Sequence, residues 1–405
     1  MNWRNEKSNR MKDVNLSICV ATKNRQYYVE ACIRSILSRN SRDDFEIVVS
    51  DDSDDRLELQ TRIADISDGR LCFSVTERPL SSIDNFIRTI ENSNGKFLCL
   101  IGDDDTILPE LFDALDCAIL NGYDCVAGNL ALNYRWPGNG IKSTYFTDTN
   151  VGGLIIDESS LRHYTIDPLE SVSLLLRNGG VNYLKFPFPK FYHGIVAREC
   201  FNKIKRHTGS YIGGLSPDVY TAVALSFVAK GVLIIDRPLT LPGVCGSSTT
   251  VTEGNLKANN IGFRSAPHFK YREHYSPSTL IPDVYCVETI WADSCLAAIT
   301  DFGRNDLLPQ FNRGKLIYRI IANHSDLVLA CLEYAAAGLN NPYHKILRVA
   351  KVLALSAVEY ISMKAERYIN RIKILIKIKR QLKIDNLEDI DKAVQAYSRA
   401  VKKVL

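Results

Sequence analysis

Residues 96–105, Lys-Phe-Leu-Cys-Leu-Ile-Gly-Asp-Asp-Asp, are the stretch that decides the fold. The apolar run that ends at Ile101 predicts a short strand buried on both faces. Three carboxylates follow at the point where this strand ends. Such strands belong to mainly parallel sheets covered by helices, and in these sheets ligands bind beyond the carboxyl ends of the strands.

The segments on either side alternate between strand and helix patterns. Further strands are predicted over 16–21, 45–50, 71–76, 191–197 and 232–236. Helices are predicted in the segments that connect these strands, over 57–66, 82–92 and 216–230 among others. The sequence therefore predicts an α/β fold with a mainly parallel sheet flanked by helices.

The length of 405 residues favours two units. Residues 1–280 hold the α/β pattern, whereas from 281 onward the pattern is helical, so 281–405 are predicted to be a helical C-terminal region. The net charge is +4, but residues 345–405 contain 15 Lys and Arg against 6 Asp and Glu. Basic and aliphatic residues mixed in this way fit an amphipathic helix on an anionic membrane surface. A helical bundle with a solvated basic face, or an oligomer contact, is the alternative.

The chain shows no secretory signal pattern and no run of about 18 apolar residues, so a membrane span is not expected. Its 11 cysteines lack CxxC spacing, which predicts buried thiols in a reducing compartment. We therefore expect a cytoplasmic protein, peripheral on the cytoplasmic face of the inner membrane. The basic residues are concentrated in the tail and no recognition motif is present, so no nucleic acid partner is expected.

The acidic cluster predicts a metal site. In an extended segment, residues i and i+2 point the same way, so Asp103 and Asp105 would share one face and one cation, while Asp104 points elsewhere, toward the nucleotide. Carboxylate oxygens suit Mg²⁺ or Mn²⁺, which take phosphate oxygens as further ligands. The alternative is a solvated acidic turn that caps the helix beginning near 108–110.

The ends of the first two strands carry candidate nucleotide contacts. Asp51 or Asp52 is predicted to accept hydrogen bonds from a base or ribose, although an Asx-turn is the alternative for both. Thr22 and Asn24 are predicted to contact the nucleoside, and Arg25 to lie near phosphate; a helix-capping turn would explain the same residues.

Asp218 follows Pro217 at a predicted helix start, where it is a candidate general base if it faces the cleft. A helix N-terminal charge that complements the dipole is the alternative. His193 is predicted to lie in the middle of a strand, as a structural residue. Four aromatic residues could form a sugar-stacking platform or simply pack in loops: Trp136, Tyr183, Phe186 and Phe188.

These motifs resemble the family 2 glycosyltransferases, which have the GT-A (Rossmann-like) fold. The resemblance rests on Ser-Ile-Cys-Val-Ala-Thr-Lys-Asn-Arg (17–25), on Ile-Val-Val-Ser-Asp-Asp-Ser (47–53) and on the Gly-Asp-Asp-Asp that ends 94–105. It covers roughly residues 16–240. Gly-Asp-Asp-Asp followed by Leu-Pro (108–109) looks like the abequosyl- and rhamnosyltransferase-like branch of bacterial O-antigen and capsule synthesis.

The resemblance implies an inverting transferase. It would move one sugar from a nucleotide-sugar donor to a glycan acceptor, expected to be lipid-linked. It also implies that Asp103 and Asp105 hold the metal and diphosphate, and that Asp218 aligns with the late catalytic carboxylate. Pro217 stands where the family often has Glu, and there is no Gln-x-x-Arg-Trp motif, which argues against a polymer synthase.

Two other classes remain open from the residues alone. A nucleotidyltransferase also uses paired carboxylates with Mg²⁺, but usually needs a Gly-rich phosphate loop after the first strand, and residues 21–28 contain no glycine. The other class is a non-catalytic partner that binds a nucleotide or a sugar.

Overall fold

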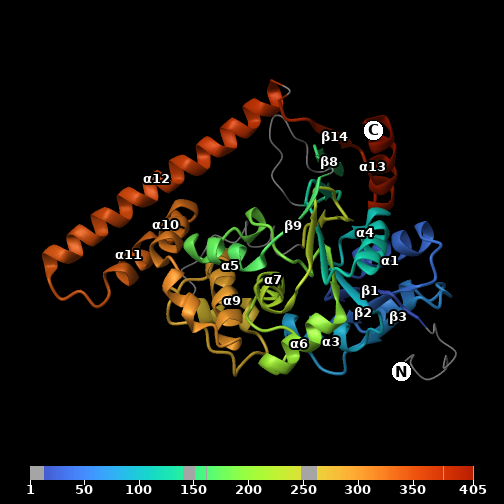
Figure 1. The fold of residues 1–405 in the computed structure, drawn as a ribbon, viewed down its shortest axis with the longest axis horizontal. Coiled ribbons are helices and arrows are strands. Elements are labelled where there is room, and N and C mark those ends of the chain that lie inside the picture. Colours follow the sequence, from blue (N-terminus) through green and yellow to red (C-terminus); the bar gives the residue numbers. More distant parts are fainter. Residues whose placement is uncertain (1–12, 140–150, 161, 248–261, 377, 405) are drawn as a thin grey trace.

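A computed structural model of the chain describes residues 13–139, 151–160, 162–247, 262–376 and 378–404. Its centre is an eight-stranded sheet with the order β3-β2-β1-β4-β10-β6-β11-β9. Its strands are β1 (Leu16–Thr22), β2 (Phe45–Asp51), β3 (Leu71–Val75), β4 (Phe97–Ile101), β6 (Cys125–Gly128), β9 (His163–Thr165), β10 (Gly194–Ala197) and β11 (Val232–Ile235). Figure 1 shows this sheet between two layers of helices.

The sheet is mainly parallel, as predicted. Strand β1 pairs in parallel with β2 and β4, β2 with β3, and β6 with β11. Strand β10 is antiparallel to both of its neighbours, β4 and β6, so β4 and β6 run in the same direction. The carboxyl ends of β1, β2, β4, β6 and β11 therefore lie along one edge of the sheet.

Helices cover both faces because the strands are apolar on both sides. Along β4, Leu98 and Leu100 pack into one core while Cys99 and Ile101 pack into the other. One face is covered by α1 (Gln26–Arg39), α2 (Glu58–Arg62) and α4 (Glu110–Asn121). The other is covered by α3 (Ser82–Glu91), α5 (Pro168–Arg177), α6 (Arg198–Thr208), α7 (Pro217–Val228) and α9 (Val287–Asp301).

Shorter strands and 3₁₀ helices complete the fold. A four-stranded sheet has the order β13-β7-β8-β14, and β5 pairs with β12. These strands are β5 (Thr106–Ile107), β7 (Leu132–Arg135), β8 (Gly153–Asp157), β12 (Thr240–Leu241), β13 (Gly243–Val244) and β14 (Gln381–Asp385). The 3₁₀ helices are η2 (Tyr183–Lys185), η3 (Phe263–Ser265), η4 (Pro267–Phe269), η5 (Asn305–Gln310) and η6 (Ser325–Leu327).

The C-terminal region is mostly helical. It comprises α9 together with α10 (Arg313–Asn323), α11 (Val328–Ala336), α12 (Pro342–Leu375) and α13 (Ile390–Val404). Helices α10 and α11 add Leu316, Ile320 and Cys331 to the core beneath α7 and α9. The 34-residue helix α12 then runs along α10 and projects from the molecule (Figure 1). Within the described ranges, no helix combines the length and the hydropathy that crossing a membrane requires.

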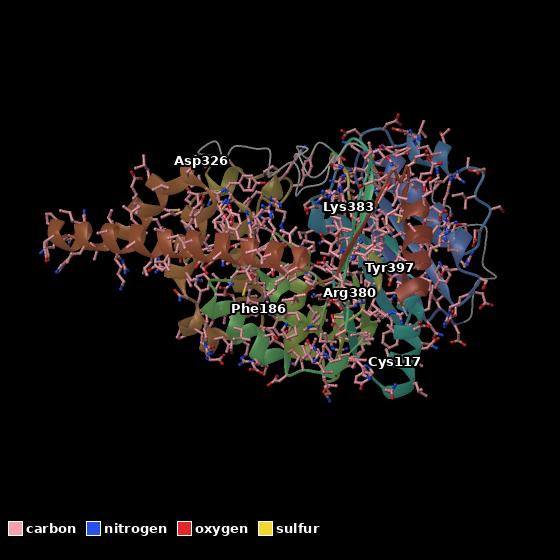
Figure 2. The ribbon with its side chains drawn as sticks, turned by 90° about the horizontal axis from the view of Figure 1, so that it is seen from above. Cys117, Phe186, Asp326, Arg380, Lys383 and Tyr397 are labelled. Carbon is pink, nitrogen blue, oxygen red and sulfur yellow. The ribbon has the colours of Figure 1, made fainter. Side chains whose placement is uncertain are left out.

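The C-terminal region is helical, as predicted, but it also contains one strand, β14, which pairs antiparallel with β8. Leu382 and Ile384 alternate with polar residues there, a period of two that indicates a strand. Helix α13 then packs on α1, where Asp391 forms an ion pair with Arg39. In Figure 2, Lys383 and Tyr397 accordingly lie over the α/β part of the chain, far from the projecting N-terminal end of α12.

Candidate active site

The three consecutive aspartates form a tight turn between β4 and β5. The amide of Asp105 donates to the carbonyl of Gly102 (3.3 Å), and the amide of Gly102 donates to Oδ2 of Asp105 (2.6 Å). The expectation of extended backbone here is therefore wrong, and with it the argument that Asp103 and Asp105 must share a face. All three side chains are nonetheless buried at the carboxyl edge of the sheet, and we call residues 102–105 the carboxylate turn.

Asp103 faces the end of β1. Thr22 donates its hydroxyl to Oδ2 (2.8 Å), and Arg25 donates from a guanidinium nitrogen to Oδ1 (2.9 Å). The same nitrogen of Arg25 is 4.0 Å from Oδ1 of Asp104. Burial raises the pKa of Asp103, although the nearby charge of Arg25 opposes the shift. The structure thus joins three of the predicted site residues, Thr22, Arg25 and Asp103, into one network.

Asp105 faces away from that network. Its Oδ1 accepts from the amide of Gly243 (2.7 Å), and its Oδ2 accepts from the hydroxyl of Tyr192 (3.0 Å). Burial raises the pKa of Asp105, and the neighbouring charge of Asp104 adds to the shift. A Cβ at Gly243 would lie 1.8 Å from the carbonyl oxygen of Asp104, so only glycine allows this approach.

The donor chemistry of the carboxylate turn fits a hard divalent cation. Two carboxylate oxygens, one from Asp103 and one from Asp104, lie around a single nitrogen of Arg25. The pKa of buried Asp103 and Asp105 is raised because the positive charge near them does not offset their burial. Mg²⁺ or Mn²⁺ would supply the missing charge. Asp105 accepts three hydrogen bonds, from Gly102, Tyr192 and Gly243, and Asp104 accepts from the amide of Cys245 (3.1 Å). The metal pair Asp103 with Asp105 stays a prediction.

The two aspartates at the end of β2 differ in how many of their carboxylate oxygens have a hydrogen-bond or ion-pair partner. Asp52 accepts from Thr76 (2.7 Å) and from the amide of Leu80 (3.0 Å), and it pairs with Lys23. Asp51 accepts from the amide of Ser53 (2.9 Å) through Oδ1, while its buried Oδ2 has no partner among the described residues. Burial raises the pKa of Asp51. Of the two, Asp51 is therefore the carboxylate that retains an unused acceptor.

Asn24 links two turns at this edge. It has a left-handed backbone (φ 56°), which asparagine tolerates better than most residues. Its side-chain nitrogen donates to the carboxylate of Asp54 (2.9 Å), and its side-chain oxygen accepts from the backbone amide of Asp54 (2.9 Å). Its backbone amide donates to Ser53 (2.8 Å). Asn24 therefore fixes the β1–α1 and β2–α2 turns relative to each other.

Asp218 lies in the first turn of α7 and is tied to hydroxyl groups. Tyr183 donates to Oδ2 (2.7 Å), and Ser216 donates to Oδ1. The Tyr192 hydroxyl donates to Asp105. Burial raises the pKa of Tyr192, and the negative charges of Asp105 and Asp218 raise it further. Tyr192 thus donates to the carboxylate turn through Asp105 and lies near enough to Asp218 for that charge to affect its hydroxyl.

Of the four aromatic residues considered for sugar stacking, Trp136, Tyr183 and Phe188 are buried, which favours the packing alternative, while Phe186 is half-buried. Trp136 donates to the carbonyl of Asp104 (2.9 Å). His193 does not lie in the middle of a strand: it precedes β10 with φ 66°, and Nδ1 lies 2.7 Å from the hydroxyl of Thr240. Burial lowers the pKa of His193 to about 3, so the ring is neutral at physiological pH.

Sequence reasoning missed Tyr192 and Gly243. Both lie far along the chain from the residues that they contact, 87 residues for Tyr192 and 138 for Gly243. The Pro-Gly pair at 242–243 signals a turn, but not which backbone it approaches.

Residues 17–138 match the family model described as Glycosyl transferase family 2. This match, together with the sheet order, confirms the predicted GT-A type of α/β fold. No curated protein sequence matches the chain. Among solved structures, S. aureus TarS 1–349 in complex with UDP-GlcNAc is 14% identical, with 88% of this chain and 92% of that chain covered and a TM-score of 0.47. The same protein in complex with UDP is 12% identical over the same shares, with a TM-score of 0.43. Similarity this low assigns no substrate or residue to this chain.

Proposed function

We propose that this chain is an inverting glycosyltransferase that moves one sugar from a nucleotide-sugar donor to a hydroxyl group of a glycan acceptor. The observation that carries the proposal is the carboxylate turn at the carboxyl edge of the sheet, whose buried aspartates suit a cation. A separate carboxylate, Asp218, lies near enough for its charge to reach Tyr192, the hydroxyl donor to Asp105. The match of residues 17–138 to a glycosyl transferase family model supports it.

The donor would occupy the ends of β1, β2 and β4. Asp51, with its unused oxygen, would accept a hydrogen bond from the base or ribose, and Thr22 would contact the nucleoside. Asn24 would keep these turns in register. Arg25 would turn from Asp103 toward a phosphate oxygen as the donor binds.

A divalent cation on Asp103 and its neighbours would offset the charge of the leaving diphosphate. Asp218 would accept the proton of the acceptor hydroxyl. The acceptor oxygen then bonds to the anomeric carbon while the bond from that carbon to the diphosphate oxygen breaks. Attack opposite the leaving group inverts the anomeric centre, and the nucleoside diphosphate carries away the bonding electron pair.

The test is a thermal-shift screen of UDP, GDP, CDP, dTDP and ADP, each with and without Mn²⁺. A ligand that binds only the folded state stabilises it by about 2.7 kcal/mol at 100 times its Kd. We expect a shift for one nucleotide that depends on Mn²⁺. The matching nucleotide sugar should then be consumed in the presence of acceptor. Binding without any sugar transfer would instead identify a non-catalytic partner.

We further propose that the protein works on a lipid-linked acceptor at the inner membrane surface, in bacterial surface polysaccharide synthesis of the O-antigen or capsule type. Helix α12 supports this location. Its exposed apolar residues recur at helical spacing on one side: Ile346, Leu353, Ile361, Tyr368, Ile372 and Leu375.

The opposite side of α12 is fixed to the protein. Val352 and Ser356 are buried there, and Glu359 pairs with Lys315 and with Arg319 (2.6 Å). The apolar stripe is thus held outward, beside basic residues of the same helix such as Arg371. An apolar stripe with basic neighbours is the surface that binds anionic lipid.

Vesicle sedimentation tests this location. The wild-type protein should sediment with phosphatidylglycerol vesicles and much less with phosphatidylcholine vesicles. The double variant Ile361→Glu with Ile372→Glu should lose this binding, whereas Leu120→Glu, at an exposed leucine of α4, should keep it. Equal sedimentation of the double variant and the wild type would refute the membrane role of α12.

A further inference from the structure

A cavity of about 1020 Å³ opens on the same edge of the sheet as the carboxylate turn. It lies beyond the carboxyl ends of β6 and β11, at Gly128 and Ile235, and the start of β9 closes it at His163. Because β4 and β6 run in the same direction, these strand ends and the carboxylate turn face the same side. The segment before β10 separates the two, and carries Tyr192 and His193 between them.

Positive charge predominates around this cavity. Arg162, Lys185 and Lys190 line it, against one carboxylate, Asp236. Asp236 already accepts from Asn129 (2.7 Å) and from the amide of Ser160 (2.8 Å). The cavity therefore offers cations to a ligand, while its carboxylate is occupied.

Lys190 forms no ion pair with any residue in the described ranges, whereas Lys185 pairs with Glu366 and Arg162 lies near the charge of Asp236. Lys190 is half-buried, and burial lowers its pKa. It also lies close enough to His193 for its charge to lower the pKa of that ring further, after burial. Taking an ammonium out of water without an anion is costly, so a bound anion at this position would be stabilised.

The wall of the cavity is connected to α12. Lys185 pairs with Glu366 of that helix (2.7 Å). One residue of the cavity wall thus contacts the helix that holds the exposed apolar stripe, and the segment before β10 separates the cavity from the carboxylate turn. A ligand with a sugar at one end, an anionic group in the middle and a lipid at the other end would suit this order.

We propose that this cavity binds the phosphate groups of the acceptor, with Lys190 as the central contact and Arg162 at the rim. This inference rests on the proposed transferase function and names the class of its acceptor: a glycan carried on a lipid diphosphate. Phosphodiester groups within a glycan would present the same chemistry. The acceptor hydroxyl would then reach Asp218 past Tyr192.

Isothermal titration of the full-length protein with geranyl diphosphate tests the proposal, with the donor site saturated by the nucleotide found in the thermal-shift screen. Lys190→Met should weaken binding at least tenfold, which corresponds to about 1.4 kcal/mol. The matched control is Lys230→Met, an exposed lysine just before β11 at the opposite edge of the sheet. It should leave the affinity unchanged. Glycerophosphoglycerol as a second ligand distinguishes the sources, because tighter binding of that phosphodiester would indicate a phosphate within the glycan.

The two proposals fail in different ways. If the nucleotide binds but Lys190→Met and the wild type bind both phosphate ligands equally, or neither ligand binds, the cavity proposal is overturned while the transferase proposal stands. If no nucleotide binds, the transferase proposal fails. Loss of geranyl diphosphate binding in Lys190→Met, measured without nucleotide, would still assign the anion site. Nucleotide affinity measured in Lys190→Met confirms that this variant is folded.

Discussion

Replacing Asp218 with asparagine is expected to remove the base of the proposed reaction while leaving the shape of the site unchanged. Asparagine has nearly the volume of aspartate and keeps one acceptor oxygen, so it can retain one of the hydrogen bonds from Tyr183 and Ser216. Loss of a hydrogen bond to a charged group costs about 1.5–3 kcal/mol. Because the Tyr183 hydroxyl can reverse and accept from the new amide, we expect the free energy of unfolding to change by less than about 2 kcal/mol.

The effect on turnover should be much larger. A positioned general base contributes about 10²–10⁴ in rate. At 1.36 kcal/mol per decade, this corresponds to about 2.7–5.4 kcal/mol of the barrier. Donor affinity should remain within about twofold of the wild type, because the hydrogen-bond partners of Asp218, Tyr183 and Ser216, are not residues of the proposed donor site.

The assay measures release of nucleoside diphosphate under saturating donor and acceptor, together with the donor Kd. The matched control is Asp301→Asn, because Asp301 accepts from the hydroxyl of Tyr220 (2.8 Å) much as Asp218 accepts from Tyr183 (2.7 Å). This second pair joins the first turn of α7 to the last residue of α9, and within the described ranges Asp301 makes no hydrogen bond or ion pair with a residue of the proposed site, so its loss should leave turnover unchanged. Wild-type turnover in Asp218→Asn would remove Asp218 from the mechanism.

Three further outcomes follow from the contacts described above. Asp103→Ala should abolish Mn²⁺-dependent nucleotide binding in the thermal-shift screen; a shift of wild-type size would show that the cation lies elsewhere. Asp51→Asn should weaken nucleotide binding about 10–100-fold in titration calorimetry, because a hydrogen-bond acceptor for the nucleotide is lost. Asp52→Asn should weaken binding mainly because the variant is less stably folded. If Asp52→Asn had the larger effect on binding, the two residues would exchange roles. The hydrogen bond with Glu288 (2.9 Å) raises the pKa of His324 and, against burial, lowers that of Glu288. The pair therefore stabilises the fold between the unfolded pKa of Glu, near 4.5, and that of His, near 6.5, and its contribution is lost as pH rises through the folded pKa of the histidine. His324→Gln should lower the free energy of unfolding by about 1 kcal/mol at pH 5.5 and by less at pH 8.5, as read by urea denaturation; an equal loss at both pH values would contradict this.

The sheet could be predicted from the sequence because its strands carry their own signal. Residues 97–101 are apolar without interruption since both of their faces are buried, and the predicted strands at 16–21 and 45–50 are recovered as β1 and β2. Parallel strands that end in polar residues at one edge also made it possible to group Thr22, Asp51 and Asp103 in advance. The structure adds the hydrogen bond between Thr22 and Asp103.

The details that depend on distant backbone could not be predicted. The turn at 102–105 is held by the amide of Gly243, which lies 138 residues away from Asp105. Periodicity cannot indicate such a contact, so extended backbone was the natural expectation for this segment. In the same way, the sequence gives no signal that Tyr192 donates to Asp105, because this hydrogen bond joins two segments that are 87 residues apart.

The basic tail consists of two parts with different roles. Helix α12 carries the exposed apolar stripe, whereas the residues after it pack against the elements that hold the carboxylate turn. The carbonyl of Leu387 accepts from Tyr134 (3.0 Å), whose ring packs on Trp136, and Trp136 holds the carbonyl of Asp104. Strand β14 and helix α13 therefore brace the carboxylate turn through the small sheet. For this reason a chain shortened at 345 would lose the membrane surface and the support of the site together, whereas substitutions on the apolar stripe of α12 change the surface alone.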